Sequence, residues 1–234
     1  MKRLAALLGG MVLGLMLVVP VQAADKQLDL VKRLGAITRP LVGKIGFAAQ
    51  VLGEKEIISL NGDDPFPMAS AYKVAMAAKA LKRIQDGELS LNQMVEVPPQ
   101  RYVFSDIIAT NFIHPGLSLS IANLMEVMIT HSDNTATDMV LELAGGPVQV
   151  TRWLKDNGIE GIRVDRPTEG LMRDFYGLES GLANMGQAIA LNRDKPDVVA
   201  APKLAFEADA LDKASPKAML RFLVMLADGD LLDK

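Results

Sequence analysis

The sequence predicts an α+β fold, in which a small antiparallel sheet is followed by a mostly helical lobe. Two strand-like segments, residues 45–52 and 57–60, flank a polar turn at residues 53–56, which is typical of a β-hairpin. Beyond residue 67 the apolar side chains recur at helical spacing instead. Two strands do not make a stable sheet alone, and the chain stops at Lys234 just after a predicted helix. We therefore interpret the chain as C-terminally truncated, with further strands and a C-terminal helix missing.

Three of the predicted helices have a local start signal. Ser118 or Ser120 caps one helix, Pro147 after a glycine pair opens another, and Ser215 with Pro216 begins the last. Between these signals the apolar residues follow the 3.6-residue period. The predicted helices cover residues 29–37, about 68–85, 121–129, 135–143, 148–156, about 182–192 and 216–226, whereas residues 91–115 are expected to be irregular.

The N-terminus has the pattern of a secretory signal peptide. Lys2 and Arg3 are followed by an apolar run over residues 4–19, and small residues lie before the expected cut. We expect cleavage after Ala23, which leaves no stable membrane anchor and places residues 24–234 in the periplasm or outside the cell. The alternative is a retained anchor helix, which the short apolar run and the proline after it disfavour.

Composition excludes several classes of function. After removal of the signal segment, 23 basic side chains stand against 28 acidic ones, which argues against nucleic-acid binding. The chain has no cysteine and therefore forms no disulfide, and it has only two histidines. Protein zinc sites are built mainly from cysteine and histidine ligands, so metal-assisted hydrolysis is disfavoured. We expect neither a metal nor another cofactor.

The strongest chemical signal is a serine and a lysine one helical turn apart, Ser70 and Lys73. Lys73 lies about 60° from Ser70 around the predicted helix, on its apolar side. A desolvated amine is costly without a partner, and it can take a serine's proton and make the hydroxyl a nucleophile. The alternative is a capping serine beside a lysine whose charged end reaches solvent. The apolar positions are Val74, Ala77, Leu81 and Ile84, and the cations on the opposite side are Lys79, Lys82 and Arg83.

A second polar motif, Ser132-Asp133-Asn134, interrupts an apolar helical run. The hydroxyl of Ser132 is suited to relaying a proton, and the amide of Asn134 is suited to holding a substrate amide. The alternative is an ordinary helix cap, in which these side chains satisfy free backbone amides. Its occurrence downstream of a Ser-x-x-Lys pair favours the catalytic interpretation.

Together these motifs resemble those of a class A serine β-lactamase, within the superfamily of penicillin-interacting serine enzymes. The likeness covers roughly residues 45–165 and, more weakly, residues 212–232. It implies a β-lactamase/transpeptidase-like fold, an antiparallel sheet flanked by helices plus a helical lobe at about 66–215. The segments that carry it are Phe66-Pro67-Met68-Ala69-Ser70-Ala71-Tyr72-Lys73, Thr130-His131-Ser132-Asp133-Asn134-Thr135-Ala136, and Gly145-Gly146-Pro147 with Thr151 and Leu154.

The resemblance implies a role for each motif residue. Ser70 would attack the β-lactam carbonyl and become acylated, and Lys73 would be its base or proton relay. Ser132 would pass a proton to the departing ring nitrogen, and Asn134 would hold the substrate's side-chain amide. Tyr102 would form an aromatic wall for the substrate, its alternative being a loop residue packed on the core. Asp133 is expected to brace the turn.

The segment from Val164 to Glu169 resembles the start of the family's Ω-loop, which carries the glutamate that activates the deacylating water. Glu169 is the nearest carboxylate, although it lies one residue later than the family's spacing. Its alternative is a surface glutamate. The resemblance also implies a closing ion pair between Arg166 and Asp212, with residues 177–206 as a long insertion within a loop spanning about 166–212.

The family's third motif, Lys-Thr-Gly or Lys-Ser-Gly, occurs nowhere in the sequence, so the chain resembles a family member truncated before it. The implied function is opening of the β-lactam ring, which confers antibiotic resistance, by a monomer whose partner is the small-molecule substrate. Two alternatives remain open. One is a D-alanyl-D-alanine peptidase or another serine hydrolase with the same nucleophile, and the other is a catalytically dead β-lactam-binding remnant.

Overall fold

A computed structural model describes residues 21–178, 193–194 and 200–233, and the chain divides into two units, Met1–Gly43 and Lys44–Lys234. In the first unit the described element is helix α1 (Val21–Thr38), which contains the predicted helix at 29–37. Most of the predicted signal peptide lies outside the described residues, so its cleavage stays a prediction. Among the helices that the structure describes, none is long and apolar enough to cross a membrane.

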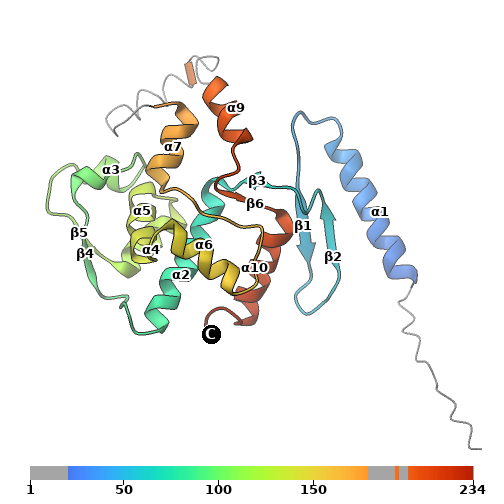
Figure 1. Cartoon of the computed structure of the whole chain (residues 1–234), viewed down its shortest axis with the longest axis horizontal. Coiled ribbons are helices and arrows are strands. Elements are labelled where there is room, and N and C mark those ends of the chain that lie inside the picture. The colour runs from blue at the N-terminus through green and yellow to red at the C-terminus, as the bar shows by residue number, and fades with distance from the viewer. Residues whose placement is uncertain (1–20, 179–192, 195–199, 234) are drawn as a thin grey trace, which may run out of the picture. The chain divides into compact units, whose positions relative to one another are not determined.

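The second unit combines short antiparallel strand pairs with a larger helical part, as the predicted α+β class requires (Figure 1). Its elements are β1 (Phe47–Gln50), β2 (Ile57–Leu60), β3 (Phe66–Pro67), the 3₁₀ turn η1 (Ala69–Tyr72), α2 (Lys73–Gln85), β4 (Met94–Glu96), the 3₁₀ turn η2 (Pro99–Arg101), α3 (Ile108–Asn111), β5 (Ser118–Ser120), α4 (Ile121–Thr130), α5 (Asn134–Leu143), α6 (Pro147–Asp156), α7 (Thr168–Tyr176), α9 (Ala200–Ala208), β6 (Lys213–Ala214) and α10 (Pro216–Asp228).

Strands β1 and β2 form the predicted hairpin. They pair antiparallel, with Phe47 opposite Leu60 and Gln50 opposite Ile57, and helix α10 packs against β1. Two further antiparallel pairs, β3 with β6 and β4 with β5, are shorter. The sequence did not predict β4, because its three residues lie in a stretch whose hydrophobic pattern has no clear period.

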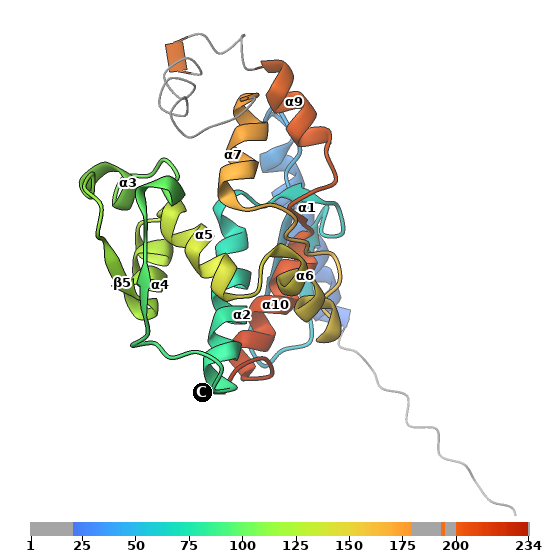
Figure 2. The same cartoon turned by 60° about the vertical axis from the view of Figure 1, so that its left-hand side comes forward.

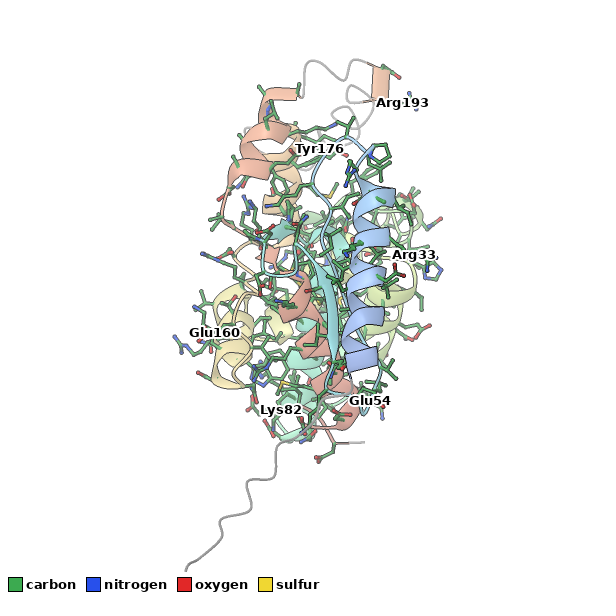
Figure 3. All side chains as sticks on the ribbon, turned by 90° about the vertical axis from the view of Figure 1, so that its right-hand side faces the viewer. Arg33, Glu54, Lys82, Glu160, Tyr176 and Arg193 are labelled. Carbon is green, nitrogen blue, oxygen red and sulfur yellow. The ribbon has the colours of Figure 1, made fainter. Side chains whose placement is uncertain are left out.

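Helix α2 lies at the centre of the hydrophobic core and packs against α4, α5 and α6 (Figure 2). The sequence predicted one apolar stripe, yet Ala75, Met76 and Ala80, which lie off that stripe, are fully buried. Several neighbours approach α2 closely because its small alanine side chains leave room for them. Near its C-terminal end the side chain of Lys82, labelled in Figure 3, lies partly exposed and pairs with Asp86.

Helices α4 and α10 begin with the serine caps that the sequence predicts, and α5 begins with a cap at Asp133, the residue expected to brace the turn. The Ser120 hydroxyl accepts the Asn123 amide at 3.2 Å, which decides between the two serines considered for that cap. At the start of α5 the Asp133 carboxylate accepts the Ala136 amide at 2.8 Å. Ser215 accepts the Ala218 amide in the same way before α10. Each cap satisfies a backbone donor that the first helical turn leaves free.

An ion pair between Arg166 and Asp212 closes the segment predicted to resemble an Ω-loop. The Arg166 Nε donates to Asp212 Oδ2 at 2.6 Å, and the Asp212 side chain is only 1% exposed. Within this segment the structure contains α7 and α9, which pack against each other and which the sequence did not predict. The helix predicted at 182–192 lies outside the described residues.

We predict that Asp212→Asn lowers the free energy of unfolding by about 2 kcal/mol, because it removes the carboxylate closest to the largely buried Arg166 guanidinium, although Asp174 and Asp209 still pair with it. Chemical denaturation measures this change. The control is Asp63→Asn, which removes an 81% exposed carboxylate that pairs with Lys217 and is expected to cost under about 1 kcal/mol. Equal effects of the two substitutions would contradict the assignment of Asp212 as the residue that closes the segment.

Candidate active site

Ser70 lies in the 3₁₀ turn η1, directly before α2, and its side chain is exposed. The preceding residue, Ala69, has φ +45°, a conformation that alanine rarely adopts. Backbone strain of this kind concentrates at functional sites, where the surrounding structure holds it in place. The turn therefore presents the Ser70 hydroxyl to solvent at the N-terminal end of a helix, where the positive end of the dipole stabilises developing negative charge.

Lys73 begins α2 and is 2% exposed, as its place on the predicted apolar side requires. Its Nζ donates three hydrogen bonds, to the Ser132 carbonyl oxygen at 2.6 Å, to Ser132 Oγ at 2.9 Å and to Asn134 Oδ1 at 2.9 Å. An ammonium has three donors, so all of them are used. The lysine is therefore fixed by the second polar motif.

The Ser132 hydroxyl connects this lysine to Ser70. It donates to Ser70 Oγ at 2.9 Å while accepting from Lys73 Nζ. Among the contacts of the described residues, Lys73 reaches Ser70 through Ser132 and not directly. Ser132 has φ +55°, which turns the backbone between α4 and α5. The three side chains form one continuous path along which a proton can move.

Burial controls the charge of the lysine. It lowers the pKa of the Lys73 ammonium from 10.5 to about 8, although the negative charges of Asp133 and Asp138 act to raise it. A substantial fraction of the Lys73 side chains therefore carries a neutral amine near pH 8. A neutral amine accepts a proton, which an ammonium does not.

Asp133 holds the turn that carries Ser132 and Asn134. Its side chain is fully buried and accepts from the Ser105 hydroxyl at 2.7 Å, the Ile108 amide at 2.9 Å and the Ala136 amide at 2.8 Å. These bonds tie the turn to the segment around residues 103–108. They match the bracing role expected of Asp133.

Asn134 contacts three partners in the site. Its Oδ1 accepts from Lys73, while its Nδ2 donates to the Phe104 carbonyl oxygen at 2.8 Å and to Met172 Sδ at 3.2 Å. The amide therefore lies between the nucleophile helix α2, the 102–105 segment and α7. The sequence did not single out Met172 as part of this site.

Tyr102 lies at the end of η2, half-buried against the core. Its hydroxyl is buried and has no hydrogen-bond partner among the described residues. The neighbouring Val103 is held by Thr135, whose hydroxyl donates to the Val103 carbonyl oxygen at 3.0 Å and accepts its amide at 2.9 Å. This placement agrees with a packing role, and contact with substrate stays a prediction.

Among the contacts of the described residues, the Glu169 side chain has none with Ser70, Lys73 or Ser132. Its side chain lines a cavity of about 950 Å³, and its carboxylate lies 3.8 Å from the Arg173 guanidinium. Ser70 and Lys73 do not line that cavity, whose walls are Pro99, Gln100, Arg101, Val103, Asp138, Leu141, Glu142, Gly145, Gly146, Pro147, Pro167 and Glu169. The interpretation of Glu169 as the residue that activates water stays a prediction.

Thr168, one residue earlier, contacts the nucleophile turn instead of the cavity. It is 3% exposed, and its hydroxyl shares a 2.5 Å hydrogen bond with the Tyr72 hydroxyl of the nucleophile turn. The buried carboxylate of Asp138 accepts the Thr168 amide at 2.6 Å and the Glu169 amide at 3.0 Å, and burial raises the pKa of this carboxyl. Sequence reasoning missed Thr168 and Asp138 because both are ordinary helix residues without a chemical motif.

A profile of the Beta-lactamase enzyme family matches residues 29–234. This range contains every site residue described above and most of the chain. The chain therefore belongs to that family, in agreement with the resemblance seen in the two motifs.

Individual relatives agree with this assignment. An imipenem-hydrolyzing β-lactamase from Enterobacter cloacae is 34% identical over 146 residues, which cover 62% of this chain and 48% of the relative. β-Lactamase Toho-2 from Escherichia coli is 33% identical over 135 residues, covering 58% of this chain and 46% of the relative. The chain thus spans about half the length of the curated relatives it matches.

Solved structures of class A β-lactamases have the same fold. An ancestral class A β-lactamase superposes with a TM-score of 0.66 and 27% identity, over 87% of this chain and 65% of that structure. A β-lactamase from Xanthomonas campestris superposes with a TM-score of 0.67 and 26% identity, over 88% and 65% of the two chains. The chain is therefore class A β-lactamase-like in fold.

We predict that Lys73→Met stabilises the fold at pH 7 by about 2 kcal/mol, because it removes the cost of burying an ammonium. The folded-state pKa of about 8 lies below the ordinary 10.5, so the unfolded chain binds more protons between these values. Wild-type stability therefore rises with pH across that window, and the advantage of the variant shrinks. Chemical denaturation at several pH values tests this, with the exposed Lys55→Met as control. A difference independent of pH would contradict it.

Proposed function

We propose that this protein opens the β-lactam ring of penicillin-type antibiotics through an acyl-enzyme on Ser70. The observation that supports this most strongly is the hydrogen-bonded path from the buried Lys73 through Ser132 to Ser70. Membership of the Beta-lactamase enzyme family and the names of its relatives support the substrate class.

The path supplies the proton transfers of acylation. With Lys73 neutral, the Ser70 hydroxyl donates to Ser132 and Ser132 donates to Lys73, so the Ser70 proton reaches the amine as its oxygen attacks the carbonyl carbon. A bond forms between Ser70 Oγ and that carbon, and the carbon–nitrogen bond of the ring then breaks. The departing nitrogen takes the proton back through Ser132. The Ser70 backbone N–H, at the start of a helix, stabilises the oxyanion in between.

The remaining site residues act on substrate binding in this proposal. Asn134 holds the substrate's side-chain amide with the same NH₂ group that donates to Phe104 and Met172 in the free protein. Tyr102 borders the substrate from the 102–105 segment. Both assignments come from the resemblance to the family, and the position of Asn134 beside Lys73 supports the first.

We also propose that the protein acts as a monomer in the periplasm or outside the cell, with residues 1–23 as a removable signal peptide. The N-terminal charge and apolar pattern support this location. Its partner is the small-molecule β-lactam.

The first test is covalent labelling. Wild-type protein incubated with benzylpenicillin is expected to gain the mass of one intact penicillin, and peptide mapping is expected to place it on Ser70. Ser70→Ala removes the attacking oxygen, so it is expected to gain nothing. Labelling of the alanine variant would overturn the assignment of the nucleophile. A wild type that is labelled by an activated D-alanyl-D-alanine ester but not by penicillin would favour the peptidase alternative.

The second test is the pH dependence of labelling. The rate of acylation is expected to rise with pH and to level off above about pH 8, because the amine of Lys73 must lose its proton first. Stopped-flow measurement with a chromogenic cephalosporin gives this profile. Ser132→Ala interrupts the path and is expected to slow acylation by roughly 10²–10⁴-fold. A flat profile would contradict the role of Lys73 as proton acceptor.

A further inference from the structure

The first turns of helix α7 place two kinds of side chain on two different faces. Thr168 and Met172 are four residues apart, so their directions differ by about 40° around the helix. Glu169 and Arg173 form a second pair with the same spacing, rotated by about 100° from the first. Among the contacts of the described residues, one of these two pairs reaches the nucleophile turn and a residue that holds Lys73.

The contacts identify that pair as Thr168 and Met172. The Thr168 hydroxyl bonds to the Tyr72 hydroxyl, and Tyr72 is the residue that precedes Lys73. The Met172 sulfur accepts from the Asn134 amide, whose oxygen in turn accepts from Lys73. The face of α7 next to the reactive group therefore carries a hydroxyl and a thioether.

Glu169 belongs to the second pair, with Arg173. Its carboxylate is placed 3.8 Å from the Arg173 guanidinium and lines the cavity between α5, α6 and residues 99–103. The negative charges of Asp133 and Asp138 act to raise the pKa of Lys73.

The two buried carboxylates near Lys73 are occupied by other groups. Asp133 accepts three hydrogen bonds from Ser105, Ile108 and Ala136. Asp138 uses one oxygen for the Thr168 amide and the other for the Glu169 amide. Within the part of the chain that the structure describes, Asp133 is fully buried, and Asp138 lines the cavity that Ser70 does not line.

We propose that the acyl-enzyme on Ser70 is long-lived, because the face of α7 that contacts Tyr72 and Asn134 presents Thr168 and Met172, neither of which readily accepts a proton from water. This inference rests on the proposed acylation of Ser70. Release of the product requires water to attack the ester carbon, the carbon–Ser70 oxygen bond to break and a proton from the water to reach that oxygen. A hydroxyl and a thioether are poor acceptors of that proton at neutral pH. Hydrolysis of the ester on Ser70 is therefore slower than its formation.

The test separates formation of the adduct from its loss. The full chain is labelled with benzylpenicillin, free antibiotic is removed, and intact-mass spectrometry follows the labelled fraction with time. The expected result is stoichiometric labelling followed by slow loss, with Glu169→Gln indistinguishable from wild type. The informative pair of variants is Thr168→Glu and Thr168→Gln. The two introduced side chains have nearly the same size, and both substitutions remove the hydrogen bond between Thr168 and Tyr72. Only the glutamate supplies a base.

Loss of the adduct is expected to be at least about tenfold faster in Thr168→Glu than in Thr168→Gln, since a positioned general base contributes roughly 10²–10⁴-fold. Rapid loss in wild type that Glu169→Gln slows would overturn the inference while leaving acylation intact. Equal rates in the two Thr168 variants would also overturn it. Absence of any adduct on wild-type Ser70 would instead reject the proposed function, and the inference with it. If Thr168→Glu does not fold, the wild-type and Glu169→Gln rates still decide.

Discussion

The site depends on one buried ammonium, that of Lys73. Water is excluded from it, so its three donors must be satisfied by protein acceptors, and the Ser132 carbonyl, the Ser132 hydroxyl and the Asn134 amide provide them. This requirement fixes the distance between α2 and the turn that joins α4 to α5. The same turn then positions the Ser132 hydroxyl against Ser70. A favourable hydrogen-bond arrangement for one lysine thus also assembles the group that can activate the serine.

Other residues of this unit hold the arrangement in place, and their strained backbone and buried charge lower the stability of the fold. Ala69 and Ser132 adopt positive φ angles next to the two reactive hydroxyls, and Asp133 is completely buried to hold the turn between them. Helix α2 provides a rigid base because its alanines allow α4, α5 and α6 to pack closely. Holding polar groups in positions that an unconstrained chain would not adopt therefore lowers the free energy of unfolding. Helix α7 is fixed by Asp138 in the same way, and its orientation decides which side chains face the ester.

The sequence predicted those parts of the molecule that local chemistry determines. The caps at Ser120 and Ser215 are local hydrogen-bond patterns, and the burial of Lys73 follows from the helical period. The strand pair β4 and β5 escaped prediction because a three-residue strand has too few positions to show alternation. Glu169 was chosen for its chemical type, but whether it points toward Ser70 depends on the rotation of α7, which is set by the contacts of Thr168 with Asp138 and Tyr72. Tertiary contacts of this kind leave no periodic signal in a sequence.

The most direct measurement of the central claim is an NMR titration of the Lys73 side chain in the folded protein, assigned by comparison with Lys73→Arg. The structure places this amine out of water, so its resonance is expected to titrate with a pKa of about 8. A midpoint near 10.5, the ordinary value for an exposed lysine, would show that the ammonium stays solvated, and the proton path from Ser70 would then have no acceptor at its end.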